Sequence, residues 1–226
     1  MAKRITTLLR QVQTTCGTKD GYYGGPSEMM DNYNTAQNNL MNYLTGLLKD
    51  YRDQRPVSPV SSQVSFDVVG ITDPFRPENG IDCALQTDGT FILTPPTDRT
   101  FAKIEAFFAG EEQVTFPSIA RLPAFIQNPN RPPIPEVPIG KSLGQRRYQI
   151  YPSGIQTLRA QVVLMPPPSN IVFDAAYQVD DALTTEMLWD DTASPFLYYG
   201  MCKEFGVEVA NPFLFQTSQA GEQKSI

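Results

Sequence analysis

The stretch that decides the fold is Ser27 to Asp53, SEMMDNYNTAQNNLMNYLTGLLKDYRD. Its apolar side chains recur at steps of three and four residues, which is the spacing of one buried face on an α-helix. Pro26 and Ser27 suit a helix start, because proline lacks an N–H that would be unsatisfied there and serine can accept one. We therefore predict one long helix over 27–53, with a buried stripe made of Met30, Tyr33, Gln37, Leu40, Leu44, Leu47, Leu48 and Tyr51.

A shorter helix is predicted before it, because Ile5, Leu8, Leu9 and Val12 have the same spacing. We expect this helix to pack on the long one. The glycine-rich segment 16–25 between them is predicted to be a loop. It lacks the preceding strand and the Lys-Ser/Thr pair of a phosphate-binding loop.

After Pro56 the period changes from 3.6 to 2, which is typical of strands. Residues 64–68 and 100–108 alternate apolar and polar side chains, and Asp88-Gly89 is a strong hairpin signal, because the favoured tight turn needs positive φ at both central positions. RRYQIYP at 146–152 and TLRAQVVLM at 157–165 are predicted to pair as a hairpin. We expect all these strands to form one antiparallel sheet.

Three further segments complete the predicted α+β fold. Residues 117–144 contain seven prolines and form an insertion in the β part. The segment 186–189 is a short apolar piece, and a helix should begin at Ser194 and end at Gly206. The predicted organisation is a helical part at 1–55 with a hairpin or bundle, an antiparallel β part at 56–168, a C-terminal strand and helix at 169–210 that pack back on the helical part, and an extended tail at 211–226.

The composition argues against several classes of catalytic protein. The chain has no histidine, so the commonest general base and metal ligand is missing. The cysteines, Cys16, Cys83 and Cys202, are odd in number and far apart, which indicates buried free thiols rather than a disulfide framework or a zinc site. No run of 18 apolar residues is present, so we predict neither a membrane segment nor a signal peptide. We predict no enzymatic activity, no cofactor and no metal.

Charge is unevenly distributed along the chain. Residues 1–55 carry seven Lys/Arg against five Asp/Glu, residues 56–168 nine against ten, and residues 169–226 two against nine. Within 119–159 only Glu136 opposes six cations, so this segment is locally positive. It is either a solvated loop or a contact surface for an acidic protein or nucleic acid. The six cations are Arg121, Arg131, Lys141, Arg146, Arg147 and Arg159.

Three blocks of the sequence resemble the head-to-tail adaptor, or neck ring, proteins of tailed bacteriophages. They are the ITTLL helix followed by a loop and a long helix with NTAQNNL, the block RRYQIYPSGIQTLRAQVVLMPPP, and the block EMLWDDTASPFLYYGMCKEFGVEV. Together they cover about half of the chain. The proline-rich segment 117–144 departs from the compact members of that family.

The resemblance implies a non-enzymatic virion protein, assembled in the host cytoplasm, that forms a ring, commonly of twelve copies, between the portal and a downstream neck or tail protein. DNA would pass through the ring without sequence-specific binding, and no membrane is involved. Phe213, Leu214 and Phe215 are expected to bind the portal or a neighbouring subunit. Contacts to a neighbouring subunit or to DNA are expected from Arg121, Arg131, Lys141, Arg146 and Arg147.

Two other functions stay open from the sequence. One is a different neck component, namely a stopper or tail-completion protein. The other is a carbohydrate-binding or carbohydrate-active β domain, with Tyr148, Trp189, Tyr198 and Tyr199 as stacking groups, although core packing explains such aromatics more simply. A glycosidase needs two carboxyl groups across a cleft, and the adjacent Asp190 and Asp191 do not suit that arrangement.

Overall fold

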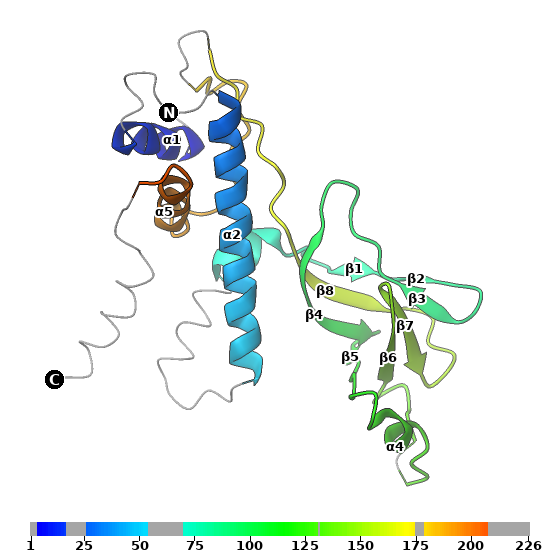
Figure 1. Ribbon diagram of the computed structural model, residues 1–226. Coiled ribbons are helices and arrows are strands. Elements are labelled where there is room, and N and C mark those ends of the chain that lie inside the picture. The colour runs from blue at the N-terminus through cyan, green and yellow to red at the C-terminus, as the bar shows by residue number, and fades with distance from the viewer. Residues whose placement is uncertain (1–3, 17–25, 54–69, 131, 175–178, 208–226) are drawn as a thin grey trace, which may run out of the picture. The chain divides into compact units, whose positions relative to one another are not determined.

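The computed structural model describes residues 4–16, 26–53, 70–130, 132–174 and 179–207, with the backbone alone over 47–53. The chain has a mixed α+β fold that divides into two compact units (Figure 1). The helical unit consists of Met1–Phe75 and Pro166–Ile226, and the barrel unit consists of Arg76–Met165. The strand predicted over 64–68 lies outside the described residues.

The helical unit contains α1 (Arg4–Thr15), α2 (Pro26–Asp53), the short 3-10 helix η2 (Asp73–Phe75) and α5 (Ser194–Glu204). The long helix predicted from the apolar spacing is α2, with 28 residues. We expected α1 to pack on this long helix. Instead α5 is the main partner of both, since α1 and α2 each pack against α5.

The buried stripe of α2 follows the predicted spacing through its described side chains. Tyr33, Leu40 and Leu44 are buried, whereas at the start of the helix Met29 is buried in place of Met30. Gln37 is also buried on this apolar face. The side chains of Leu47, Leu48 and Tyr51 lie outside the described residues.

Gln37 can be buried on that apolar stripe because its side chain is hydrogen-bonded. The Gln37 Nε2 donates to Asn34 Oδ1 at 2.9 Å and to the Pro167 carbonyl at 3.0 Å. Asn34 Oδ1 also accepts the backbone N–H of Ser169 at 3.0 Å. A buried amide is tolerated when its donors are paired, and here the pairing fixes the segment after the barrel unit to α2.

The barrel unit contains two four-stranded antiparallel sheets, ordered β1-β8-β4-β5 and β2-β3-β7-β6. The prediction of a single sheet is therefore wrong. A short helix, α4 (Leu122–Ile126), lies between β5 and β6 in the sequence. The strands are β1 (Ile81–Asp82), β2 (Ala84–Leu85), β3 (Thr90–Ile92), β4 (Phe101–Ala109), β5 (Glu112–Gln113), β6 (Ile139–Gly144), β7 (Arg147–Tyr151) and β8 (Arg159–Leu164).

Both edges of one sheet are joined to the other, so the two sheets close into a small barrel. Only Cys83 separates β1 from β2, and one extended segment therefore pairs with β8 and then with β3. At the opposite edge, Thr115 forms a parallel bridge with Ile139, and the Gly140 N–H donates to the Thr115 carbonyl at 2.8 Å.

The predicted hairpin between 146–152 and 157–165 is wrong. β7 pairs with β3 and β6, and β8 pairs with β1 and β4, so the two strands belong to different sheets. Each strand alternates buried and more exposed side chains in its first residues. The buried side chains of β7 and β8 enter the same core. They do so from two facing sheets, not from neighbouring strands of one sheet.

The hairpin predicted at Asp88-Gly89 is present between β2 and β3, but its turn differs from the expected type. Only Gly89 has a positive φ, of 76°, because the Asp88 carboxylate accepts the backbone N–H and hydroxyl of Thr90 and holds the turn through its side chain. The positive φ values at two consecutive non-glycine residues occur instead at Gln145 and Arg146, between β6 and β7.

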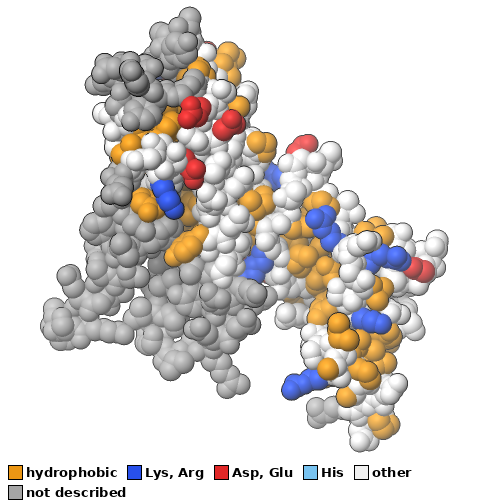
Figure 2. Space-filling model, in the orientation of Figure 1, with side chains coloured by type: hydrophobic (Ala, Val, Ile, Leu, Met, Phe, Trp, Pro, Cys, Tyr) orange, Lys and Arg blue, Asp and Glu red, His pale blue; other side chains and the backbone are white. Residues whose placement is uncertain are grey.

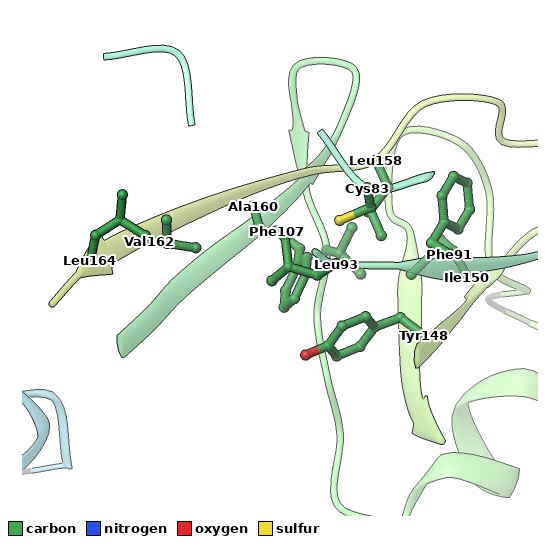
Figure 3. Close-up of a cluster of buried hydrophobic side chains, with 11 residues drawn as sticks. Cys83, Phe91, Leu93, Phe107, Tyr148, Ile150, Leu158, Ala160, Val162 and Leu164 are labelled. Atoms are coloured by element: carbon green, nitrogen blue, oxygen red, sulfur yellow. The ribbon is translucent and has the colours of Figure 1, made fainter. Parts of the chain in front are cut away.

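The barrel core is formed by side chains from both sheets (Figure 3). Phe107 of β4 and Tyr148 of β7 have ring centroids 4.5 Å apart, and Phe107 lies 5.1 Å from Phe116. Figure 3 shows Leu93, Phe107 and Tyr148 pointing toward one another. The core consists of Cys83, Phe91, Leu93, Phe107, Val114, Tyr148, Ile150, Leu158, Ala160, Val162 and Leu164.

The segment 186–189 does not form the C-terminal strand that the sequence predicts within 169–210. Trp189 is fully buried, and its ring centroid lies 4.4 Å from that of Phe75. Glu186 uses its carboxylate to accept the backbone N–H groups of Arg4 and Ile5. The segment is therefore fixed by one aromatic contact and one helix cap, without strand pairing.

Candidate interaction surface

The proline-rich segment 117–144 carries the most conspicuous surface feature among the described residues. Five large apolar side chains are exposed there, and the most exposed are Ile119 at 84% and Val137 at 57%. Figure 2 shows hydrophobic side chains gathered over the part of the barrel unit that carries α4 and β6. We call these five residues the apolar patch: Ile119, Phe125, Ile134, Val137 and Leu143.

The barrel holds this segment at both ends. After β5, the Thr115 N–H donates to the Pro138 carbonyl at 3.0 Å, in addition to the parallel bridge with Ile139. A Cβ on Gly140 would lie 2.4 Å from the Phe116 ring, so the glycine allows β6 to approach this aromatic side chain. The sequence prediction of an insertion ending at residue 144 is corrected here, because its last six residues form β6.

Within the segment, short local structures direct the apolar side chains outward. Leu122 of α4 is buried, whereas Phe125 on the same helix is exposed. Ile134 and Val137 form an antiparallel bridge, and the Val137 N–H donates to the Ile134 carbonyl at 2.9 Å. Exposed apolar side chains grouped on one segment are typical of a protein-binding surface.

The predicted contact cations have different surroundings. Arg121 is exposed at the start of α4, and Lys141 is half-buried in β6. Arg146 is exposed at the β6–β7 turn, where its guanidinium carbon lies 5.2 Å from the centroid of the Phe101 ring. Arg131 lies outside the described residues. These positions place Arg121 and Lys141 on the segment that carries the apolar patch.

Arg147 and Arg159 are neutralised by acids distant in sequence. Arg147 Nη2 lies 2.6 Å from Asp88 Oδ2, and Arg159 Nε lies 3.2 Å from Asp82 Oδ1. The Thr90 hydrogen bonds, together with the charge of Arg147, hold the pKa of Asp88 below its usual range. Two of the six cations in 119–159 are therefore paired with acids from outside that segment.

The acidic residues of 179–193 also have local roles. Asp191 lies 3.8 Å from Arg4, and the Thr6 hydroxyl donates to Asp181. Asp190 accepts the backbone N–H of Ala193 at 3.1 Å, just before α5. Each of these three carboxylates therefore has a defined partner in the helical unit.

The aromatic residues considered for carbohydrate stacking are only partly accessible. Tyr148 and Trp189 are buried in the two cores. Tyr198 is half-buried on α5, and its hydroxyl lies 2.6 Å from Thr15 Oγ1. Tyr198 also borders an open groove on α1, whose other lining residues are Thr7, Arg10, Gln11, Thr14 and Thr15.

Three further observations concern sites and relatives. Among the described residues, no group of three Asp, Glu or Cys side chains is arranged to hold a metal ion, and no helix is both long and apolar enough to cross a membrane. Phe213, Leu214 and Phe215 lie outside the described residues.

Comparison of the sequence with protein-family models and with curated proteins gave no match.

The sequence reasoning identified the segment but missed the apolar patch. The prolines of 117–144 predict an insertion, and its cations are predicted contact residues. The signal for the patch was also in the sequence, because isoleucine, valine and phenylalanine lie among prolines with no helical or strand period that could bury them.

Proposed function

We propose that the chain is a non-enzymatic structural protein of a bacteriophage virion, a head-to-tail adaptor that forms a ring between the portal and the tail. The three sequence blocks that resemble the neck ring proteins support this proposal. A helical unit combined with a β unit agrees with the organisation that the resemblance implies. We expect a ring of twelve copies, through which DNA passes without sequence-specific binding.

The observation that carries the proposal is the apolar patch. A ring requires two different, complementary surfaces on each subunit, and an isolated subunit would leave one of them exposed. The patch has an apolar centre with Arg121 and Lys141 on the same segment, which resembles the apolar core and polar rim of protein interfaces. The acidic region 179–193 of a neighbouring copy offers the opposite charge.

Native mass measurement of the purified chain, alone and mixed with the portal protein of the same virion, tests the proposal. We expect an oligomer or a portal complex that Val137→Asp abolishes, because the new carboxylate would be desolvated at the contact. Leu85→Asp is the matched control, since Leu85 is also exposed, at 42%, but lies in β2, outside the apolar patch and outside 179–193. A wild-type chain that stays monomeric and binds no portal would overturn the proposal.

Arg146 provides a second test of the proposed assembly. Its guanidinium is exposed and makes no ion pair within the part of the chain that the structure describes. Arg146→Glu should weaken assembly, and the wild-type interaction should weaken as salt concentration rises. Unchanged assembly in this variant would show that Arg146 makes no contact with a partner.

The tail adds a separate part to the proposal. We propose that Phe213, Leu214 and Phe215 anchor the chain on the portal or on an adjacent neck subunit. Truncation after Ala210 should leave a folded subunit that no longer stays on the portal. Equal portal binding by the truncated and full-length chains would exclude this role.

A stopper or tail-completion protein is the second candidate. The apolar patch suits either position in the neck, so the binding partner decides between them. A chain that binds the downstream tail protein but not the portal would favour the stopper. The carbohydrate-binding alternative is less favoured, because Tyr148 and Trp189 are buried.

A further inference from the structure

Two of the three cysteines lie together in the helical unit, although 186 positions separate them in the sequence. Cys16 continues the last turn of α1, where its N–H donates to the Val12 carbonyl at 2.8 Å. Cys202 lies on α5, the helix against which α1 packs. Tyr198 is one turn before Cys202 on the same face of α5, and its hydroxyl lies 2.6 Å from that of Thr15. This contact brings the two cysteines to the same end of the helix pair.

The two thiols are neighbours across the contact between α1 and α5, since Cys202 contributes to the raised pKa of Cys16 and Cys16 partly lowers the pKa of Cys202. Both side chains are buried, with exposed fractions of 4% for Cys16 and 0% for Cys202. The third cysteine, Cys83, is buried in the core of the barrel unit. The fold therefore converts an odd set of distant cysteines into one adjacent pair and one separate thiol.

We propose that Cys16 and Cys202 are a dithiol pair that oxidises to an intramolecular disulfide joining α1 to α5. The oxidant is a small-molecule disulfide such as oxidised glutathione. The Cys202 thiolate attacks one sulfur of the oxidant and releases the first small thiol. The Cys16 thiolate then attacks Cys202 in the mixed disulfide and releases the second. Two protein thiols lose two electrons and two protons, and one small disulfide is reduced to two thiols.

The surroundings favour Cys202 as the first nucleophile and make the reaction slow. Burial raises the pKa of Cys16 to about 12 and also raises that of Cys202, but hydrogen bonds with Cys16 and Tyr198 partly lower the pKa of Cys202. Few thiolates exist in the closed structure, and the oxidant needs access. Oxidation therefore proceeds when the contact between α1 and α5 opens, and the disulfide then keeps the two helices together.

The test treats the folded, full-length chain with oxidised glutathione, then unfolds and alkylates it. We expect a mass about 2 Da lower before alkylation, one alkyl group, on Cys83, and a peptide linking Cys16 to Cys202 that reduction removes. Cys83→Ser should keep the linked peptide, and Cys202→Ser should lose it. The oxidised chain should melt roughly 5 °C higher than the reduced chain.

Three results would overturn the proposal. One is alkylation of all three thiols at oxidant concentrations that oxidise the unfolded chain. Another is a linkage that contains Cys83 or that joins two copies of the chain. The third is a lower melting temperature of the linked chain, since a pair that fits the native fold must not destabilise it. The peptide mapping uses the wild-type chain, so it stays decisive if a variant fails to fold.

Discussion

The carboxylate of Glu186 accepts the backbone N–H of Arg4 at 3.1 Å, across 182 positions of sequence. The other carboxylate oxygen accepts the N–H of Ile5 at 3.2 Å. The first N–H groups of a helix have no partner within the helix and lie at its positive end, so an acceptor carrying negative charge stabilises them. α1 is therefore capped by a residue from the opposite end of the chain.

Replacing Glu186 should loosen α1. Glu186→Ala removes both acceptors, and we expect the free energy of unfolding to fall by about 1–2 kcal/mol. Urea unfolding followed by circular dichroism measures this change. Glu204→Ala is the control, because Glu204 is exposed near the end of α5. Equal losses in the two variants would show that the cap contributes nothing.

Leu44 tests the buried stripe of α2. It is 3% exposed, so Leu44→Asp would bury a charge without a partner and should cost about 3–5 kcal/mol, enough to reduce soluble yield. Asn39→Asp places the same carboxylate on the exposed face of the helix and should be nearly neutral. A normal melting temperature for Leu44→Asp would contradict the assigned face.

Two glycines should respond to alanine with opposite signs. Gly140→Ala places a methyl group against Phe116 and should destabilise the barrel unit by about 1–3 kcal/mol. Gly46 is exposed in α2, where an added Cβ meets no atom within 4 Å. Gly46→Ala should therefore stabilise the helix by roughly 0.5–1 kcal/mol. Thermal melts of both variants measure the two shifts, and a stabilising Gly140→Ala would argue against the close approach to Phe116.

Asp88 should make stability depend on pH in the acidic range. Because its pKa in the folded chain is lowered from 3.8, the contribution of this carboxylate to stability is fully present above that value and is lost as pH falls through the lowered pKa. Asp88→Asn keeps an oxygen for Thr90 but removes the charge beside Arg147. The stability difference between wild type and Asp88→Asn should shrink as pH falls, as measured by urea unfolding at several pH values.

A control separates this effect from general acid unfolding. Asp98→Asn changes an exposed carboxylate of the same unit, and its difference from wild type should depend less on pH. A pH-independent difference for Asp88→Asn would mean that the ion pair with Arg147 does not contribute to stability.

Local patterns in the sequence predicted local structure well. The stripe through Tyr33, Leu40 and Leu44 identified α2, because helical periodicity depends only on neighbours along the chain. Asp88-Gly89 identified a hairpin for the same reason. The turn type was missed because the Asp88 side chain bonds to Thr90, an interaction that competes with the expected backbone geometry.

Pairing between distant segments could not be predicted in the same way. β6 contains Gly140 and polar residues, which have low β propensity. It is a strand because it pairs with β7, and its glycine allows the close approach to Phe116. The neutralisation of Arg147 by Asp88 and the meeting of Cys16 with Cys202 depend on the closed fold. The apolar patch likewise could not be predicted, because the exposure of its side chains depends on which residues pack together in the fold.

The division of the chain into units sets an order of events during synthesis on the ribosome. The barrel unit is one continuous segment, whereas the helical unit is made of segments on both sides of it. α1 and α2 leave the ribosome first, but α5 and the Glu186 cap are not yet translated. Domains fold as their residues emerge. We therefore expect the barrel unit to fold before α5 is available to pack against α1 and α2. During that interval, their apolar faces are the part of the nascent chain most in need of a chaperone.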